Sequence, residues 1–349
     1  MIRIAIIGTG GMANAHADNF KKIRGCKLVA ACDVVENRAG SFAQRHGIAA
    51  DAVFSDVRDL LGTVDCDAVS IVATDLAHAP LSMACIAAGK HVLCEKPLAT
   101  CYGDARKMAE AARRKGVINM VNFSYRNSSA IHKAAELVRR GEIGRVIHFD
   151  ASYLQSWLVA NTWGDWRTND GLLWRLSTRH GSRGTLGDIG VHILDFATYP
   201  IGEAASVCCR LKTFPKAKGN RIGKYVLDAN DSAAITVEMA NGALGTVHTS
   251  RWATGYANCL QLRIHGDRGA IRIDLDKSYT QLEICRGKDV NTNTWKPLNC
   301  GKTPSIYQRF IQSIRTGRND QPDFARGAEV QQILDACFAS DAKCAAVKL

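Results

Sequence analysis

The chain has 349 residues, of which 46% are hydrophobic and 22% are charged, and its formal net charge is +12. This length suits two folded domains, and no apolar run approaches the roughly 20 residues of a membrane-spanning helix, so we expect no membrane partner. Lysine and arginine are spread along the chain without a nucleic-acid-binding motif, which argues against nucleic acid as a partner.

Residues 1–122 alternate between short apolar runs and longer segments with helical spacing. The helical segments 81–88 and 105–114 are each followed by a glycine, Gly89 and Gly116, as helices commonly are. Such alternation predicts an α/β domain with a parallel, doubly wound sheet. The strands expected in it are Ile2–Ile7, Leu28–Cys32, Ala68–Val72, His91–Cys94 and Val117–Val121.

The pattern changes over residues 123–349, where strands dominate. A helix near Ser129–Arg140 and another over Gly187–Tyr199 are separated by a strand and a long loop rich in tryptophan and arginine. Asn241-Gly242, between two β-rich runs, is a hairpin signal. We expect an α+β domain with an open, largely antiparallel sheet and C-terminal helices that pack back on the body. The expected strands are 146–153, 204–213, 232–239, 243–252, 259–265, 270–275 and 280–285.

The first strand runs into Gly8-Thr9-Gly10-Gly11-Met12-Ala13, which opens a helix. Gly8 permits a tight turn, Gly10 lets backbone N–H groups approach a pyrophosphate, and Ala13 allows close contact between helix and strand. Asp33 ends the second strand about 20 residues later, where a carboxylate can accept hydrogen bonds from ribose hydroxyls. The same charge repels a ribose phosphate, so the pattern favours NAD over NADP, a preference that Arg38 could soften.

The fifth strand ends in Glu95-Lys96-Pro97. Ligands of doubly wound sheets bind beyond the carboxyl ends of the strands, which places Lys96 at the cofactor cleft. An ammonium there can polarise a substrate oxygen, although a lysine before a proline is, taken alone, an ordinary surface residue. Pro97 also raises the chance of a cis peptide bond.

A second constellation lies within residues 187–195. On a helix, Asp188, His192 and Asp195 fall at i, i+4 and i+7, so one face carries two carboxylates and an imidazole. Oxidation of an alcohol requires a base that takes the hydroxyl proton while hydride leaves the carbon, and histidine suits this role near neutral pH.

Together these motifs resemble the Gfo/Idh/MocA family of oxidoreductases over essentially the whole chain. The resemblance implies a Rossmann domain over residues 1–122, a substrate-binding and oligomerisation domain over residues 123–349, and cis geometry before Pro97. It implies that Lys96 polarises the reacting oxygen, that His192 is the acid/base and that Asp188 contacts substrate hydroxyls. The residues that it assigns to the cofactor are Gly8, Thr9, Gly10, Gly11, Met12, Asp33, Thr74, His78, Glu95, Lys96, Asn122, Trp174 and Arg175. Those that it assigns to the substrate are Lys96, Tyr125, Gln155, Trp157, Arg175, Arg183, Asp188 and His192.

Within the family, residues 153–158, Trp174-Arg175 and Ser182-Arg183 look like the branch that contains levoglucosan dehydrogenase and glycoside 3-dehydrogenases. Tryptophan faces stack on the C–H faces of sugars, and arginine binds hydroxyls or phosphates. The alternative is that the tryptophans of residues 157–174 simply anchor a long loop. Two departures stand out: residues 74–78 lack the Pro and Asn common there, and an insertion within 166–174 could favour an acidic or phosphorylated sugar.

The motifs predict an NAD-dependent dehydrogenase that oxidises a secondary ring hydroxyl, at C3, of a sugar, anhydrosugar or glycoside. Two alternatives stay open: a glycosidase with retained NAD that works by transient oxidation, elimination and hydration, and a non-catalytic NAD-binding regulator. The presence of both Lys96 and His192 disfavours the regulator.

The thirteen cysteines are odd in number and never form C-x-x-C, which predicts neither disulfides nor a metal site and favours the cytoplasm. Open sheets often pair across their exposed face, so we expect a homodimer or homotetramer.

Overall fold

The computed structural model describes residues 1–349 as two compact units. The first unit contains Met1–Ser124 and Pro304–Gln331, and the second contains Tyr125–Thr303 and Gln332–Leu349. Residues 304–331 therefore group with the dinucleotide-binding fold, whereas the sequence pattern assigned them to the second domain. None of the helices is both long and apolar enough to cross a membrane.

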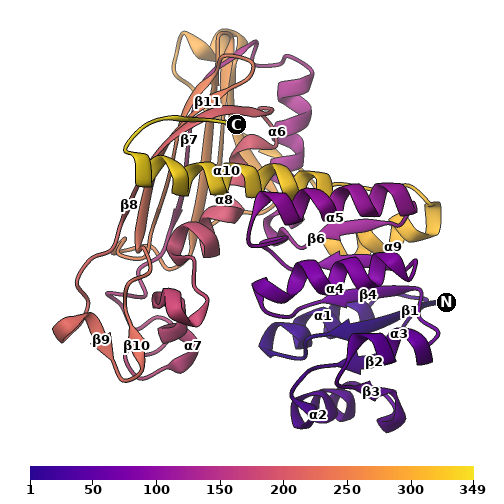
Figure 1. Ribbon diagram of the computed structural model, residues 1–349. Coiled ribbons are helices and arrows are strands. Elements are labelled where there is room, and N and C mark those ends of the chain that lie inside the picture. The colour runs from indigo at the N-terminus through magenta and orange to yellow at the C-terminus, as the bar shows by residue number, and fades with distance from the viewer. The chain divides into compact units, whose positions relative to one another are not determined.

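The first unit is built on a six-stranded sheet in which every paired strand is parallel, in the order β3-β2-β1-β4-β5-β6 (Figure 1). This order is that of a Rossmann fold and confirms the predicted doubly wound sheet. The strands are β1 (Ile2–Ile7), β2 (Cys26–Cys32), β3 (Val53–Phe54), β4 (Ala68–Ile71), β5 (His91–Cys94) and β6 (Asn119–Val121).

Helices connect these strands and pack on the sheet. Helices α1 and α2 pack on β2, and α4 packs on β4 and β5. Gly89 and Gly116 follow α4 and α5 with φ of 73° and 67°, the left-handed conformation that commonly ends a helix. The helices of this unit are α1 (Gly11–Lys21), α2 (Glu36–His46), α3 (Val57–Thr63), α4 (Asp75–Ala87), α5 (Tyr102–Lys115), α9 (Ile306–Thr316) and the first part of α10 (Phe324–Lys343).

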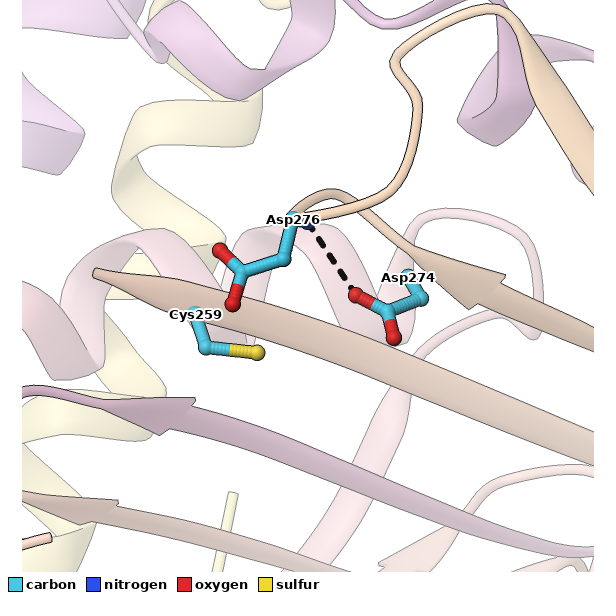
Figure 2. Close-up of side chains that lie close together, drawn as sticks. All are labelled: Cys259, Asp274 and Asp276. Carbon is cyan, nitrogen blue, oxygen red and sulfur yellow. Dashed lines mark hydrogen bonds between the residues drawn. The ribbon is translucent and has the colours of Figure 1, made fainter. Parts of the chain in front are cut away.

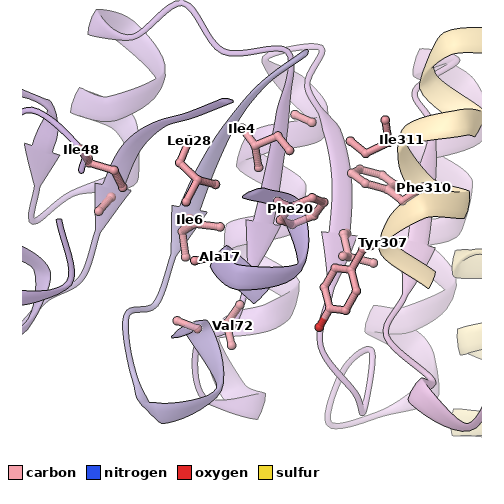
Figure 3. Close-up of a cluster of buried hydrophobic side chains, with 14 of the residues drawn as sticks. Ile4, Ile6, Ala17, Phe20, Leu28, Ile48, Val72, Tyr307, Phe310 and Ile311 are labelled. Carbon is pink, nitrogen blue, oxygen red and sulfur yellow. The ribbon is translucent and has the colours of Figure 1, made fainter. Parts of the chain in front are cut away.

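One buried apolar cluster explains why the late segment belongs to the first unit. Figure 3 shows Ile4 and Ile6 of β1 with Phe20 of α1, and beside them Tyr307 and Phe310 of α9. The Phe20 ring meets the Tyr307 ring edge to face, with centroids 5.3 Å apart. The amphipathic helix α9 thus supplies part of the core on which the glycine turn after β1 rests.

The second unit is built on a nine-stranded sheet in the order β16-β15-β14-β13-β7-β12-β11-β8-β17. Only β7 and β12 pair in parallel, and the other ladders are antiparallel, as predicted for the most part. The strands are β7 (Val146–Leu154), β8 (Ala204–Lys212), β11 (Ser232–Met239), β12 (Leu244–Ser250), β13 (Cys259–Gly266), β14 (Gly269–Asp274), β15 (Gln281–Arg286), β16 (Lys296–Asn299) and β17 (Val347–Lys348), with a separate hairpin of β9 (Arg221–Ile222) and β10 (Tyr225–Val226). The helices of this unit are α6 (Ser129–Arg139), α7 (Asp170–Leu173), α8 (Val191–Thr198) and the part of α10 from Gln332 onward.

The large sheet has one buried and one exposed face. Along β11, Ile235 and Val237 are buried while Thr236 and Glu238 are exposed, which is the period of two expected for a strand covered on one side. Helix α8 packs on β7, β12 and β13, and all of its residues are buried (Figure 1). This packing fixes α8 and the residues just before it against the sheet.

Candidate active site

In the first unit, the turn after β1 has no room for a side chain at Gly8 but is open at Gly10 and Gly11. Gly8 has φ of 84°, and a Cβ there would lie 2.6 Å from backbone atoms of Val72 and Ala73. A Cβ at Gly10 or Gly11 would meet nothing within 4 Å, so the turn is open on that side. Helix α1 begins here, and its first N–H groups and positive dipole end form a site suited to a phosphate.

Asp33 lies directly after β2 and is buried beside the glycine turn. One carboxylate oxygen accepts hydrogen bonds from the backbone N–H of Thr9 (2.8 Å) and from its hydroxyl (2.9 Å), and the other accepts from the N–H of Val35 (2.9 Å). Arg38 lies 3.5 Å away. Although burial raises the pKa of Asp33, these hydrogen bonds and Arg38 hold it below its ordinary value. The carboxylate is therefore ionised at neutral pH.

Thr74 and His78, at the start of α4, are predicted cofactor residues, and His78 is buried between two backbone carbonyl groups. Its Nδ1 lies 2.7 Å from the Pro97 carbonyl oxygen, and its Nε2 lies 3.1 Å from that of Ala73. Both partners can only accept, so both ring nitrogens carry protons. Although burial lowers the pKa of His78, Cys94 and the Pro97 carbonyl raise it to about 10. His78 thus joins the turns after β4 and β5, and Thr74 is the N-cap residue just before α4.

Glu95 lies in a buried hydrogen-bond network that anchors the predicted catalytic lysine. Its Oε1 lies 2.8 Å from His16 Nε2 and accepts from Asn122, while its Oε2 accepts from the backbone N–H of Lys96 at 3.1 Å. Although burial raises the pKa of Glu95, His16, Lys96 and Asn122 lower it to about 2. The peptide bond between Lys96 and Pro97 is cis, as the resemblance implied.

His16 is a member of this buried network that sequence reasoning missed. It lies on the buried face of α1, where its Nδ1 is 2.8 Å from Ser70 Oγ and its ring meets that of Tyr307 edge to face. The available signal was a polar residue on an otherwise apolar helix face, flanked by Ala13 and Ala17.

In the second unit, the predicted Asp188–Asp195 stripe divides into two environments. Residues Leu186–Gly190 form a π-helical turn that leads into α8, a distortion that is frequent at functional sites. A Cβ at Gly187 would lie 2.4 Å from the Cβ of Arg183, so this turn requires glycine. Asp195 is buried and accepts two hydrogen bonds from Arg126, at 2.6 and 2.7 Å, which makes it structural. Asp188 is 26% exposed.

His192 lies beside a group of hydroxyl and amide side chains. The ring of Tyr125 meets it edge to face, with centroids 5.0 Å apart. The hydroxyls of Tyr125 and Tyr153 are hydrogen-bonded to each other, and Asn258 accepts from Tyr153 and from Gln155, both at 2.8 Å. The structure therefore links the predicted Tyr125 and Gln155 through Asn258, which sequence reasoning missed because it stands alone in an exposed turn.

Two arginines approach the Asp188 carboxylate. Arg251 Nη2 donates to Asp188 Oδ2 at 2.9 Å, and the predicted Arg175 places its Nε 3.5 Å from the same oxygen. The guanidinium of Arg175 also lies over the exposed ring of Trp174. Arg251 was missed by sequence reasoning, since it is a single basic residue after a strand.

Other predicted sugar-binding residues lie in packed surroundings. Trp157 and Trp166 are buried in a cluster with leucines of the long loop, so these two tryptophans anchor that loop as the alternative reading held. Trp157 donates from its indole N–H to Gln155 at 3.0 Å. Arg183 lies 3.5 Å from Asp335, with its guanidinium over the Phe338 ring.

A thiol and two carboxylates meet where β13 begins and β14 ends (Figure 2). Asp274 accepts a hydrogen bond from the backbone N–H of Asp276 at 3.1 Å, which is the dashed line in Figure 2, and another from Gln261 at 3.0 Å. Burial and a hydrogen bond to Asp276 raise the pKa of the Cys259 thiol to about 12. Each oxygen of the Asp274 carboxylate thus accepts one hydrogen bond, from the Asp276 backbone and from the Gln261 side chain.

Comparison with known proteins matches both units to one family. Residues 2–123 match the model of the oxidoreductase family with an NAD-binding Rossmann fold, and residues 131–272 match the GFO/IDH/MocA C-terminal domain. Levoglucosan dehydrogenase of Pseudarthrobacter phenanthrenivorans is 28% identical over 98% of this chain and 96% of its own length. D-glucoside 3-dehydrogenase of Escherichia coli is 30% identical over 71% of this chain and 70% of its own. A solved structure of levoglucosan dehydrogenase with NADH and levoglucosan has a TM-score of 0.86 at 27% identity and covers 99% of both chains.

The residues of the first unit fit NAD. No atom lies within 4 Å of the position that a Cβ would take at Gly10 or Gly11. This open side of the turn can accept a pyrophosphate at the start of α1. The ionised Asp33 suits the hydroxyls of an adenosine ribose and disfavours a phosphate there. The cofactor of this oxidoreductase is therefore NAD.

Proposed function

The chain belongs to the Gfo/Idh/MocA family of NAD-binding oxidoreductases, and on that premise we propose that it oxidises a secondary ring hydroxyl, at C3, of a sugar, anhydrosugar or glycoside. The observation that carries the proposal is the placement of His192 beside the Tyr125, Tyr153 and Asn258 hydrogen-bond group, next to a partly exposed Asp188. Such a group offers several donors and acceptors to a polyhydroxylated ring. The relatives named for levoglucosan and for position 3 of glucosides support the same substrate class.

The proposed chemistry assigns one task to each of three side chains. Lys96 donates a hydrogen bond to the reacting oxygen and lowers its proton affinity. His192 takes the hydroxyl proton as the C–O bond becomes a carbonyl. Asp188 accepts a hydrogen bond from a neighbouring hydroxyl and orients the ring. NAD bound at the Gly8–Met12 turn would supply the hydride acceptor, which would take up the two electrons, while His192 takes the proton.

The structure supports these assignments through the surroundings of each group. The hydrogen bonds among His16, Glu95 and the backbone N–H of Lys96 hold the Lys96 backbone in place, so its side chain extends from a fixed position. Burial and the Tyr125 hydroxyl raise the pKa of Tyr153, so the Tyr153 hydroxyl keeps its proton and remains a hydrogen-bond donor. Asn258 and Gln155 contribute further polar groups to the same hydrogen-bond group as Tyr153.

We also propose that the chain forms a homodimer or homotetramer through the exposed face of the nine-stranded sheet. That face carries short and polar side chains such as Ala234, Thr236 and Glu238, on which a second sheet can pack. Light scattering coupled to size-exclusion chromatography tests this: a molar mass of two or four chains is expected, and a mass of one chain contradicts it.

Absorbance at 340 nm tests the proposed reaction. We would measure NADH formation with NAD, then with NADP, across neutral sugars, anhydrosugars, glycosides, inositols, uronates and sugar phosphates. Turnover that requires NAD and disappears in Lys96→Ala and His192→Ala supports the proposal. No turnover across the panel refutes it, and release of nitrophenol from a nitrophenyl glycoside without net NADH would assign the chain to the glycosidases that retain NAD.

A further inference from the structure

A cation that is completely buried lies behind the Asp188 carboxylate. The side chain of Arg251 has no exposed surface, whereas that of Asp188 is 26% exposed and that of Arg175 is 35% exposed. Arg251 donates from Nη2 to Asp188 Oδ2 and from Nη1 to the carbonyl oxygen of Arg175, both at 2.9 Å. The guanidinium fork thus ties the carboxylate to the backbone of the loop that carries Arg175.

A second buried ion pair supports Arg251 from behind. Lys216 and Asp231 have no exposed side-chain surface, and Lys216 Nζ lies 2.6 Å from Asp231 Oδ2. The backbone N–H of Arg251 donates to the carbonyl of Asp231 at 3.0 Å, and the Asp231 carboxylate also attracts the Arg251 charge. Four charged groups therefore lie in sequence from the core of the second unit to the exposed edge of Asp188.

Buried ion pairs of this kind contribute little net free energy to folding. Taking charged groups out of water is costly, and apolar residues of similar volume often give an equally stable core. An array that ends on the carboxylate assigned to the substrate indicates a role in holding that carboxylate.

We propose that Arg251 is a positioning residue for substrate recognition: it holds Oδ2 of Asp188, so that the carboxylate meets the substrate hydroxyl in one orientation. The inference rests on the proposed function. Arg251 cannot touch a substrate because its side chain has no exposed surface, so it acts on turnover through the groups that it holds, chiefly the Asp188 carboxylate. Arg175 approaches the same oxygen, but its side chain is 35% exposed. Arg175 can therefore contact a substrate directly, which Arg251 cannot.

A double-mutant cycle distinguishes positioning from a general structural role. Arg251→Met frees the carboxylate, and we expect kcat/KM for the sugar to fall by about 100-fold, as for a misplaced binding group. In an Asp188→Asn background the carboxylate is already gone, so the same change should alter kcat/KM by less than about threefold. Arg251→Met should also lower the thermal midpoint less in the Asp188→Asn protein than in the wild type, because only the contacts of Arg251 with Asp231 and with the Arg175 carbonyl remain to be lost there.

The chain offers a matched control and a conservative variant. Arg272 of β14 makes two hydrogen bonds to Glu283 of the neighbouring strand, so Arg272→Met removes an arginine–carboxylate pair that is partly exposed and should leave kcat/KM within about twofold. Arg251→Lys keeps the charge but not the planar fork, and we expect a loss of about 10-fold. This variant serves in the cycle should Arg251→Met fail to fold.

The experiment measures steady-state kinetics of the wild type, both single variants and the double variant with NAD and the best sugar. Where Asp188→Asn turns over too slowly, the sugar Kd of the NADH-bound protein, read from NADH fluorescence, replaces kcat/KM. Equal losses in both backgrounds would overturn the positioning role while leaving the proposed function intact. A wild type that turns over no sugar would refute the proposed function and this inference with it.

Discussion

Replacing Glu95 by Gln should remove a pH-dependent contribution to stability whose size follows from the structure. The pKa of Glu95 is about 2 in the folded chain, against an ordinary value of 4.5, because His16 and Asn122 stabilise the buried carboxylate. A folded pKa below the unfolded one gives stability that is present above pH 4.5 and lost as the pH falls through 2. At about 1.36 kcal/mol per unit, the full contribution is about 3 kcal/mol, and about 2 kcal/mol of it is lost between pH 4.5 and 3.

The assay is denaturant unfolding of the wild type and Glu95→Gln at pH 6 and pH 3. All six tryptophans lie in the second unit, so far-UV circular dichroism follows both units while tryptophan fluorescence follows the second alone. We expect the variant to be less stable at pH 6 by about 3 kcal/mol and the gap to narrow by about 2 kcal/mol at pH 3. The exposed Glu110, which pairs only with arginines of α5 at 3.0 and 3.8 Å, provides the control Glu110→Gln. A stability difference that stays constant between pH 6 and pH 3 would show that Glu95 does not have a lowered pKa in the folded chain.

Three further perturbations test other parts of the structure. Asp33→Asn removes the charge that disfavours a ribose phosphate while leaving Arg38, so kcat/KM for NADP should rise by about 10-fold in absorbance assays; an unchanged value would contradict the assigned role. Tyr153→Phe removes the hydroxyl that donates to Asn258, and kcat/KM for the sugar should fall by about 10-fold with the KM for NAD unchanged, whereas equal effects on both ligands would argue for misfolding. Phe310→Ala in the core cluster of the first unit should cost about 3 to 5 kcal/mol in calorimetry, and a cost below about 1 kcal/mol would mean that α9 does not pack there.

Local sequence signals were sufficient for most of the fold. The expected strands Ile2–Ile7, His91–Cys94 and Ser232–Met239 coincide with β1, β5 and β11, because each is a β-rich run bounded by turn residues. The hairpin at Asn241-Gly242 joins β11 and β12 as predicted. The strands β3, β9, β10 and β17 were missed because two residues do not establish a period, and β16 was missed because Pro297 interrupts its β-rich pattern.

The groups that organise the candidate site were harder to foresee. His16 pairs with Glu95 across 79 positions, Arg251 with Asp188 across 63, and Asn258 with Tyr153 across 105. Each is one polar residue whose partner is brought near only by tertiary packing, so no local period or spacing marks it. Glycine turns and the Asp188–Asp195 stripe are local, which is why they could be found.

The helix around Asp188 shows the same limit within a single element. Helical spacing predicted one face for Asp188, His192 and Asp195, but a π-helical turn precedes α8, and Asp195 is bound by Arg126 inside the fold. The partner of Asp195 lies 69 positions away, so spacing alone did not separate its structural role from the roles assigned to the other two.

We propose that hydride leaves the C3 carbon of a sugar ring for NAD. Incubation with a sugar deuterated only at C3, chosen from the substrates that turn over, followed by mass spectrometry of the reduced cofactor, tests it directly. We expect reduced cofactor that carries one deuterium, and loss of the signal in Lys96→Ala. Reduced cofactor without deuterium would show that a carbon other than C3 is oxidised.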